Sequence, residues 1–280
     1  MKHVQQLPPP RDRWGRPIID NTVYTRASGL AVDDKSGLLR WAAGMAALGA
    51  ASNDTLRNSI LTLDPESPTY KKDLYKLGEQ AKEHAGGSKA ASDGTSIHRA
   101  TEMFDHGKDI THLPAQLRDA VVAYQQLLAD HGLIPLAAEV FVACPALKVA
   151  GTLDRLVMRP DGTVCVLDLK TGGPDTHKYA GLSWATQIAA YAHSDPYCGE
   201  RGWLTWDTVG LVEPNADVGL VAHVPQTGEP ARLWVINLDA GWEAAKTASA
   251  VQAQRKTKYL TEATRPGAGN TTSHKKEAVA

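Results

Sequence analysis

The sequence is poor in the residues that define several protein classes. Its 280 residues include three cysteines and two phenylalanines, and no two cysteines form a C-x-x-C pair. Three thiols are too few for a four-thiolate zinc or iron–sulfur site. Neither sign of charge prevails, because 30 lysines and arginines are matched by 31 aspartates and glutamates. Binding of nucleic acid through bulk positive charge is therefore excluded, whereas a local basic groove is not.

Long hydrophobic runs are also missing. The most apolar stretch, Trp41 to Ala51, is well short of the roughly 20 residues of a membrane span. The first residues lack the apolar core of a signal peptide. Apolar types make up 42% and charged types 22%, as in ordinary globular proteins. We expect a soluble protein of the reducing cytoplasm with no membrane partner.

The first half of the chain has the periodicity of helices. The proline-rich beginning is expected to be extended, and apolar residues then recur at helical spacing, with capping residues between the runs. The expected elements are an extended segment over 1–24, a packed helix over 34–51, helices over 56–63 and 67–81, a loop over 85–91, a helix capped by Asp93, and a helix that begins at Pro114 and ends at Gly132.

From Leu136 onward the pattern becomes that of β-strands, since short runs rich in branched residues alternate with turn residues. The expected elements are strands over 136–143, 149–158 and 163–170, a helix over 179–193, a hairpin of strands 218–224 and 232–238, and a helix capped by Asp239. We therefore divide the chain into an extended segment (1–24), a helical part (25–134), a mixed α/β core (135–258) and a disordered tail (259–280).

The turn Arg159-Pro-Asp-Gly162 predicts the register of the two strands that flank it. If Arg159 is opposite Thr163, Asp154 lies opposite Asp168. Alternation of side chains then puts both aspartates on one face, with Lys170 one pleat further along. The other face is apolar and consists of Leu153, Val157, Cys165, Leu167 and Leu169.

Two carboxylates opposed across a ladder repel each other and need a compensating charge. A divalent cation with oxygen ligands, Mg²⁺ or Mn²⁺, is the economical solution. Such a metal polarises a phosphoryl oxygen and activates water, while the Lys170 ammonium positions the nucleophile or offsets developing charge. The arrangement therefore suits phosphodiester hydrolysis; the alternative is an exposed hairpin end with a salt bridge.

Four short motifs follow one another along the chain, on an expected helix, two strands and a helix. They are Gly94-Thr-Ser-Ile-His98, Gly151-Thr-Leu-Asp154, Asp168-Leu-Lys170 and Gln187-Ile-Ala-Ala-Tyr191. In this order they resemble the RecB-like exonuclease clade of the PD-(D/E)XK nuclease superfamily, which includes CRISPR-associated and phage exonucleases. The resemblance implies a restriction-endonuclease-like α/β core with a mixed central sheet flanked by helices, preceded by a helical part that closes over the site.

The resemblance also implies a role for each matching residue. The metal ligands would be His98, Asp154, Asp168 and the carbonyl of Leu169. Asp154, Asp168 and Lys170 would be catalytic, and Gln187 and Tyr191 would contact the DNA backbone or brace the site. Without the resemblance, His98 reads as an ordinary helix-surface histidine.

Several further residues have two readings. Glu102 lies one helical turn after His98 and either accepts the second ring N–H or is a solvated glutamate. Glu139 interrupts an apolar strand and either supports the metal site or marks an edge strand. Arg155 is a phosphate contact or a solvated cation, whereas Trp184 is expected in the core.

Taken together, these observations predict a metal-dependent DNA exonuclease of recombination, repair or DNA processing. The resemblance implies Mg²⁺ or Mn²⁺ as cofactor without an iron–sulfur cluster, and DNA as partner, with a single-strand annealing or other recombination protein as a further one. If the protein is phage-encoded, it would act in the host cytoplasm. The alternatives are a structure-specific endonuclease with the same site and a non-catalytic DNA-binding adaptor that retains the fold.

Overall fold

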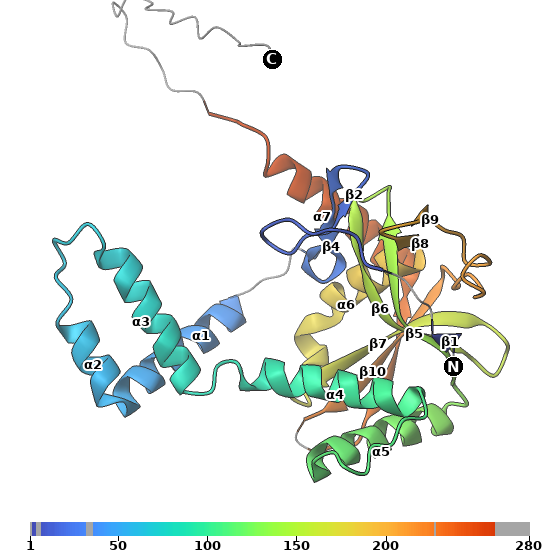
Figure 1. The fold of residues 1–280 in the computed structure, drawn as a ribbon, viewed down its shortest axis with the longest axis horizontal. Coiled ribbons are helices and arrows are strands. Elements are labelled where there is room, and N and C mark those ends of the chain that lie inside the picture. Colours follow the sequence, from blue (N-terminus) through green and yellow to red (C-terminus); the bar gives the residue numbers. More distant parts are fainter. Residues whose placement is uncertain (1, 4–6, 32–35, 227, 261–280) are drawn as a thin grey trace, which may run out of the picture.

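The computed structural model describes residues 2–3, 7–31, 36–226 and 228–260. Helices flank a nine-stranded sheet, and a helical arm extends to one side of it (Figure 1). Apart from residues 259 and 260, the expected disordered tail lies outside the described residues.

The helices and strands follow the expected order, with short strands added before α1 and between α6 and β10. The helices are η1 (Ala27–Gly29), α1 (Ser36–Ser52), α2 (Asp54–Leu61), α3 (Tyr70–His84), α4 (Lys89–Asp105), α5 (Ala115–Asp130), α6 (His177–Ala192) and α7 (Leu238–Gln254). The strands are β1 (Lys2–His3), β2 (Ile18–Ile19), β3 (Thr22–Val23), β4 (Thr25–Arg26), β5 (Ile134–Cys144), β6 (Val149–Met158), β7 (Val164–Gly172), β8 (Asp195–Cys198), β9 (Gly202–Trp203), β10 (Val218–Pro225) and β11 (Arg232–Asn237).

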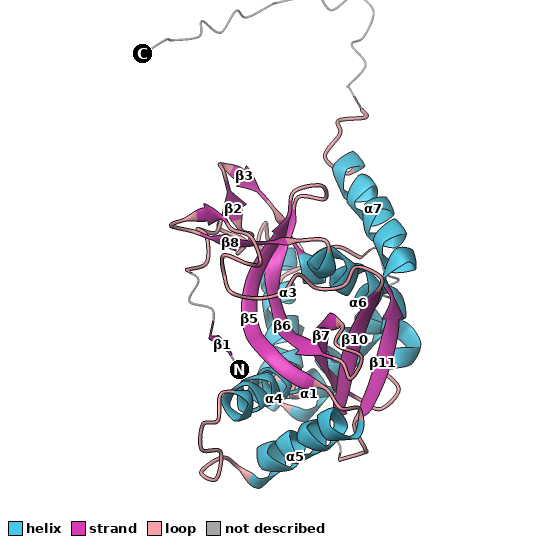
Figure 2. Ribbon diagram, turned by 90° about the vertical axis from the view of Figure 1, so that its right-hand side faces the viewer, coloured by secondary structure: helices cyan, strands magenta, loops and turns pink. Residues whose placement is uncertain are grey.

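The central sheet is mixed, as predicted. Its main order is β11-β10-β7-β6-β5-β8-β9, with β1 and β4 paired beside it. Strands β7 and β10 are parallel, whereas β5–β6, β6–β7 and β10–β11 are antiparallel. One hydrophobic cluster packs α6 and α7 against the sheet and a second packs α4 and α5 against its other face (Figure 2). The predicted α/β fold is therefore confirmed.

The strict alternation expected along β6 fails at Asp154. Leu153 and Leu156 both belong to the cluster under α6, although they are three residues apart. Strand β5 shows the same change of phase, and there the backbone of Glu139 has a φ of 53°, which is rare for a residue with a side chain. The pairs on either side place Glu139 opposite Asp154. A paired irregularity of this kind redirects side chains at the sheet's centre.

The helical arm formed by α1, α2 and α3 (residues 36–84) corrects the expectation of a packed helix. Within α1 only Gly49 is buried, whereas Leu39 and Leu48 are 67% and 57% exposed. A Cβ atom at Gly49 would lie 1.7 Å from the carbonyl oxygen of Ala81, so α1 and α3 meet through small residues. The large side chains of α1 consequently remain outside the contact.

The aspartates expected to cap α4 and α7 occupy other positions. Asp93 lies four residues inside α4 and pairs with Lys89 at 2.6 Å, so the expected loop is shorter. The cap of α7 is Asn237, whose side-chain oxygen accepts the N–H of Ala240 at 3.1 Å. Asp239 instead sits in the first turn, where its charge favours the helix dipole.

Candidate active site

A cleft of about 1240 Å³ opens where β6 and β7 separate. Its walls come from the N-terminal segment, α4, the three central strands and the residues that follow β10. The charged residues and the histidine that line it are Arg26, His98, Arg99, Glu102, Glu139, Asp154 and Lys170. The expected helical part, residues 25–134, supplies lining residues from α4 and from the region of η1. None of the described residues of the arm lines the cleft.

The predicted register holds up to the edge of this cleft. Strands β6 and β7 pair from Met158 and Val164 to Arg155 and Leu167, in the register that the turn predicts. The ladder then stops, one pair before the two aspartates. The Asp154 carboxylate instead accepts the N–H of Leu169 at 2.7 Å. Separation of the strands at this point makes room for the cleft.

Asp168, Lys170 and Gln187 form a closed triangle of polar contacts. The Lys170 Nζ lies 2.7 Å from Asp168 Oδ2 and donates to Gln187 Oε1 at 3.0 Å. Gln187 Nε2 donates to Asp168 Oδ1 at 3.0 Å. Helix α6 thus holds both ends of the Asp-x-Lys motif, with Gln187 only 7% exposed. This geometry favours bracing over contact with a substrate for Gln187.

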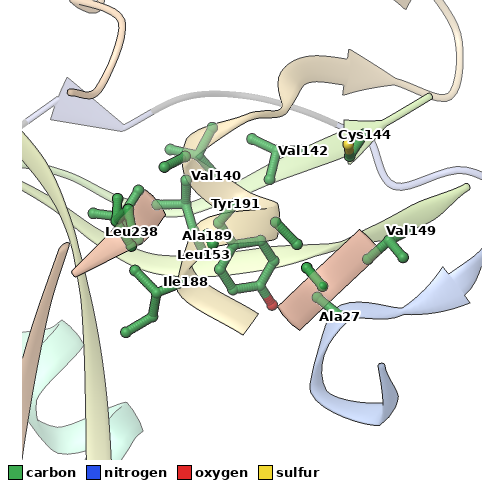
Figure 3. Close-up of a cluster of buried hydrophobic side chains, with 14 of the residues drawn as sticks. Ala27, Val140, Val142, Cys144, Val149, Leu153, Ile188, Ala189, Tyr191 and Leu238 are labelled. Atoms are coloured by element: carbon green, nitrogen blue, oxygen red, sulfur yellow. The ribbon is translucent and has the colours of Figure 1, made fainter. Parts of the chain in front are cut away.

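Tyr191 lies one helical turn further along α6 and is 4% exposed. Its hydroxyl would be 2.8 Å from a Cβ atom at position 151, so only glycine fits opposite it. Figure 3 shows its ring among Val140, Leu153 and Ile188. Burial raises the pKa of Tyr191 well above its usual range. Tyr191 therefore braces β6 against α6, and Trp184, on the same helix, is in the core as predicted.

Helix α4 brings His98 to the cleft. The His98 Nδ1 lies 3.4 Å from Asp154 Oδ2, and burial lowers the pKa of the imidazole, which keeps it neutral and able to ligate a metal. A Cβ atom at Gly94 would lie 2.6 Å from Thr171 Oγ1, so the glycine allows α4 to approach β7. Glu102 lines the cleft but lies 3.9 Å from His106 Nε2.

The acids of the cleft are held in conditions that disfavour their charged forms. Burial, together with the Asp154 charge, raises the pKa of Asp168 to about 6, although Lys170 opposes the shift. Burial also raises the pKa of Asp154. Removal from water and the charge of Asp154 raise the pKa of Glu139 to about 7. Clefts in which carboxyl pKa values are raised in this way are typical of functional sites.

Asp154, Asp168 and His98 carry the kinds of ligand atoms that a hard divalent cation accepts. Two carboxylates short of compensating charge and a neutral imidazole are ligands that Mg²⁺ or Mn²⁺ accepts. Within the described ranges, however, no three His, Cys, Asp or Glu side chains converge into a ready coordination set. Lys170 and Gln187 take both oxygens of Asp168. A cation would therefore have to displace at least one of these contacts.

Arg155 is not a phosphate contact, because its side chain is 1% exposed. Its Nε donates to Asp105 Oδ2 at 2.5 Å, and the Tyr124 hydroxyl donates to the same oxygen at 3.1 Å. Fifty residues separate Arg155 from Asp105, so no local pattern predicts this buried pair. The arginines at the cleft, Arg26 and Arg99, also lie outside the sequence motifs.

One comparison finds a known family that part of the chain resembles. Residues 76–194 match the family model of the PD-(D/E)XK nuclease superfamily. The matched segment contains His98, Asp154, Asp168, Lys170, Gln187 and Tyr191. The match covers less than half of the chain, and it does not distinguish the RecB-like clade.

The other comparisons add little. No curated protein matches the chain. One matching solved structure, described as "Crystal structure of SSO0001", is 12% identical, covers 56% of this chain and 74% of its own, and has a TM-score of 0.25. In the described part of the chain, no helix has the length and hydropathy needed to cross a membrane.

Proposed function

We propose that this protein is a metal-dependent nuclease that hydrolyses DNA phosphodiester bonds, as an exonuclease in recombination, repair or DNA processing. One observation carries the proposal. Asp154 and Lys170 line a cleft at the point where β6 and β7 separate, and Asp168 is buried against Lys170, inside the segment that matches a nuclease superfamily. The resemblance of the four motifs to the RecB-like clade supports exonucleolytic action.

The residues that would hold the metal are Asp154, Asp168, His98 and the carbonyl of Leu169. When bound, Mg²⁺ or Mn²⁺ supplies a Lewis acid for the phosphoryl oxygen and lowers the pKa of bound water. The Leu169 N–H holds one oxygen of Asp154 and so fixes the orientation of that carboxylate. Asp168 would be able to hold the metal if Lys170 Nζ released its carboxylate.

Lys170 then has a second task. Its ammonium is 2.7 Å from Asp168 and is also held by Gln187, so release from the carboxylate leaves it tethered beside the reacting centre. A cation in this position orients the attacking water or offsets charge that develops on the phosphate. Gln187 therefore positions Lys170, and Tyr191 supports the strand that carries Asp154.

Two other functions remain as alternatives. An endonuclease that recognises DNA structure would use the same residues, and a binding adaptor would retain the fold without cutting. Against the adaptor, the desolvation that raises the pKa of Asp168 to about 6 is a cost that binding alone does not require. A single-strand annealing or other recombination protein is the partner we propose for the exonuclease.

The test is cleavage of end-labelled linear DNA and of covalently closed circular DNA, in Mg²⁺, in Mn²⁺ and in EDTA. We expect the unsubstituted protein to degrade linear DNA only, and only with metal. Asp168→Asn and Lys170→Met should each lower the rate by about 100-fold or more. Asp207→Asn, an exposed acid outside the cleft, is the matched control and should change nothing. Equal activity in all variants would refute the site, and cutting of closed circles would favour the endonuclease.

A further inference from the structure

Two arginines from distant parts of the sequence line the same cleft. Arg26 directly precedes η1, and Arg99 follows His98 on α4. Both residues are exposed, and both line the cleft that Asp154 also lines. Within the described ranges, neither arginine forms an ion pair with a carboxylate. Two guanidinium groups therefore remain available at the rim.

The fold anchors the segment that carries Arg26. Strand β4 pairs with β6, and the Thr25 N–H donates to the Lys148 carbonyl at 2.8 Å. On the other side Leu30 is fully buried, and its carbonyl accepts a hydrogen bond from Gln252 of α7 at 2.9 Å. The exposed arginine thus projects from a backbone that is fixed at both ends. Side chains presented in this way are pre-organised for binding.

The cleft contains charged side chains of both signs. Three carboxylates, those of Glu102, Glu139 and Asp154, line it. The Lys170 ammonium already faces Asp168. The chain as a whole has a net charge of −1 and gives a polyanion no general attraction. Arg26 and Arg99 are the remaining cations that line the cleft.

We propose that Arg26 and Arg99 form a phosphate-binding pair that holds the nucleic-acid backbone on either side of the cleaved bond. The inference rests on the proposed function and adds to it the residues that hold the substrate. Guanidinium groups suit this task, because their planar fork binds two phosphate oxygens at once. Arg26 lies outside the segment that matches the superfamily, so this half of the pair belongs to the chain's own N-terminal region.

The experiment measures binding apart from cleavage. Fluorescence anisotropy with a labelled DNA duplex, in EDTA and over a series of KCl concentrations, gives affinity and its salt dependence. We expect Arg26→Gln and Arg99→Gln each to weaken binding by about tenfold. Each should also reduce the slope of log K against log salt by about 0.9. Arg26→Lys should keep the slope but lose part of the affinity, because lysine retains the charge without the fork.

Arg40→Gln is the control, since Arg40 is an exposed arginine of the helical arm outside the cleft. It should leave both affinity and slope unchanged. A double variant Arg26→Gln/Arg99→Gln that folds, judged by its thermal midpoint, and keeps the original slope would overturn the inference even if the protein cuts DNA. If the arginine substitutions reduce the slope of log K against log salt but the unsubstituted protein does not cut DNA, the nuclease function is refuted. The phosphate-binding pair would then still hold. Absence of binding by the unsubstituted protein would overturn both.

Discussion

Two ionic networks begin at neighbouring residues of β6 and have opposite characters. Arg155 leads into a sealed network with Asp105 and Tyr124, in which both charged side chains are 1% exposed. Asp154 leads into the cleft network of Asp168 and Lys170, where the lysine is 24% exposed. Burial raises the pKa of the acids in both networks, so the networks differ in access: the sealed one is closed to solvent, whereas Asp154 and Lys170 line an open cleft.

Burial of charge therefore does not by itself mark a functional site. A buried and fully paired arginine contributes to a unique packing of α4 and α5 on the sheet. The cleft carboxylates are desolvated as well, but Asp154 and Lys170 border an open cleft. A metal ion can reach and stabilise desolvated carboxylates that lie beside an accessible volume.

The largest effect is expected in the sealed network. Arg155→Met leaves the Asp105 carboxylate buried without its cation, which should destabilise the fold by about 3–5 kcal/mol. Urea unfolding followed by circular dichroism measures this. The double variant Asp105→Leu/Arg155→Met removes both charges and should recover much of the loss. If Arg155→Met left the free energy of unfolding unchanged, the sealed network would not have the structural role assigned to it.

Asp168→Asn should have the opposite profile. Loss of its ion pair with Lys170 is offset by relief of a desolvated carboxylate, so stability should change by about 1 kcal/mol or less. Cleavage should nevertheless fall by about 100-fold or more. Unfolding and activity measured on one preparation check both. Destabilisation as large as that of Arg155→Met would show that the cleft network is structural too.

Gly94→Ala tests the approach of α4 to the cleft. The new methyl group would meet Thr171 Oγ1 at 2.6 Å, and the resulting shift of α4 moves His98. Cleavage should fall by about 10- to 100-fold, and Thr171→Ala in the same chain should restore part of it. Gly78→Ala in α3 is the control, because nothing lies within 4 Å of its new atom. That control should stabilise the arm by about 0.5–1 kcal/mol.

The smallest effect concerns pH. The pKa of Glu139 is raised to about 7 in the folded state, so its ionisation opposes folding. The contribution of this group to stability is therefore lost as pH rises from about 4.5 to 7. Glu139→Gln lacks this loss, and its thermal midpoint relative to the original protein should rise between pH 5 and pH 8. A difference in thermal midpoint that stays constant with pH would contradict the raised pKa of Glu139.

The sequence predicts the local parts of this architecture well. Proline and glycine in the turn after β6 specify a hairpin, and the register inferred from them holds for every pair from Met158 to Arg155. Strand β6 has the predicted bounds, since both of its ends follow from turn residues. Helix α6 was expected over 179–193 and begins two residues earlier.

Features that depend on contacts between distant segments could not be predicted from the sequence. The phase change at Asp154 depends on the left-handed backbone of Glu139 in a neighbouring strand. The pair of Arg155 and Asp105 joins elements fifty residues apart. In α1 the periodicity shows an apolar helix but says nothing of what covers it, and most of its large side chains are exposed. Each miss therefore reflects a contact between distant segments.

The central claim is that Asp154 and Asp168 share a divalent cation. A crystal grown with Mn²⁺, measured for its anomalous signal, tests it most directly. We predict one strong peak in contact with both carboxylates and His98, with Lys170 Nζ withdrawn from Asp168 yet still held by Gln187. A cleft without anomalous signal, in which Lys170 keeps its contact with Asp168, would contradict the account.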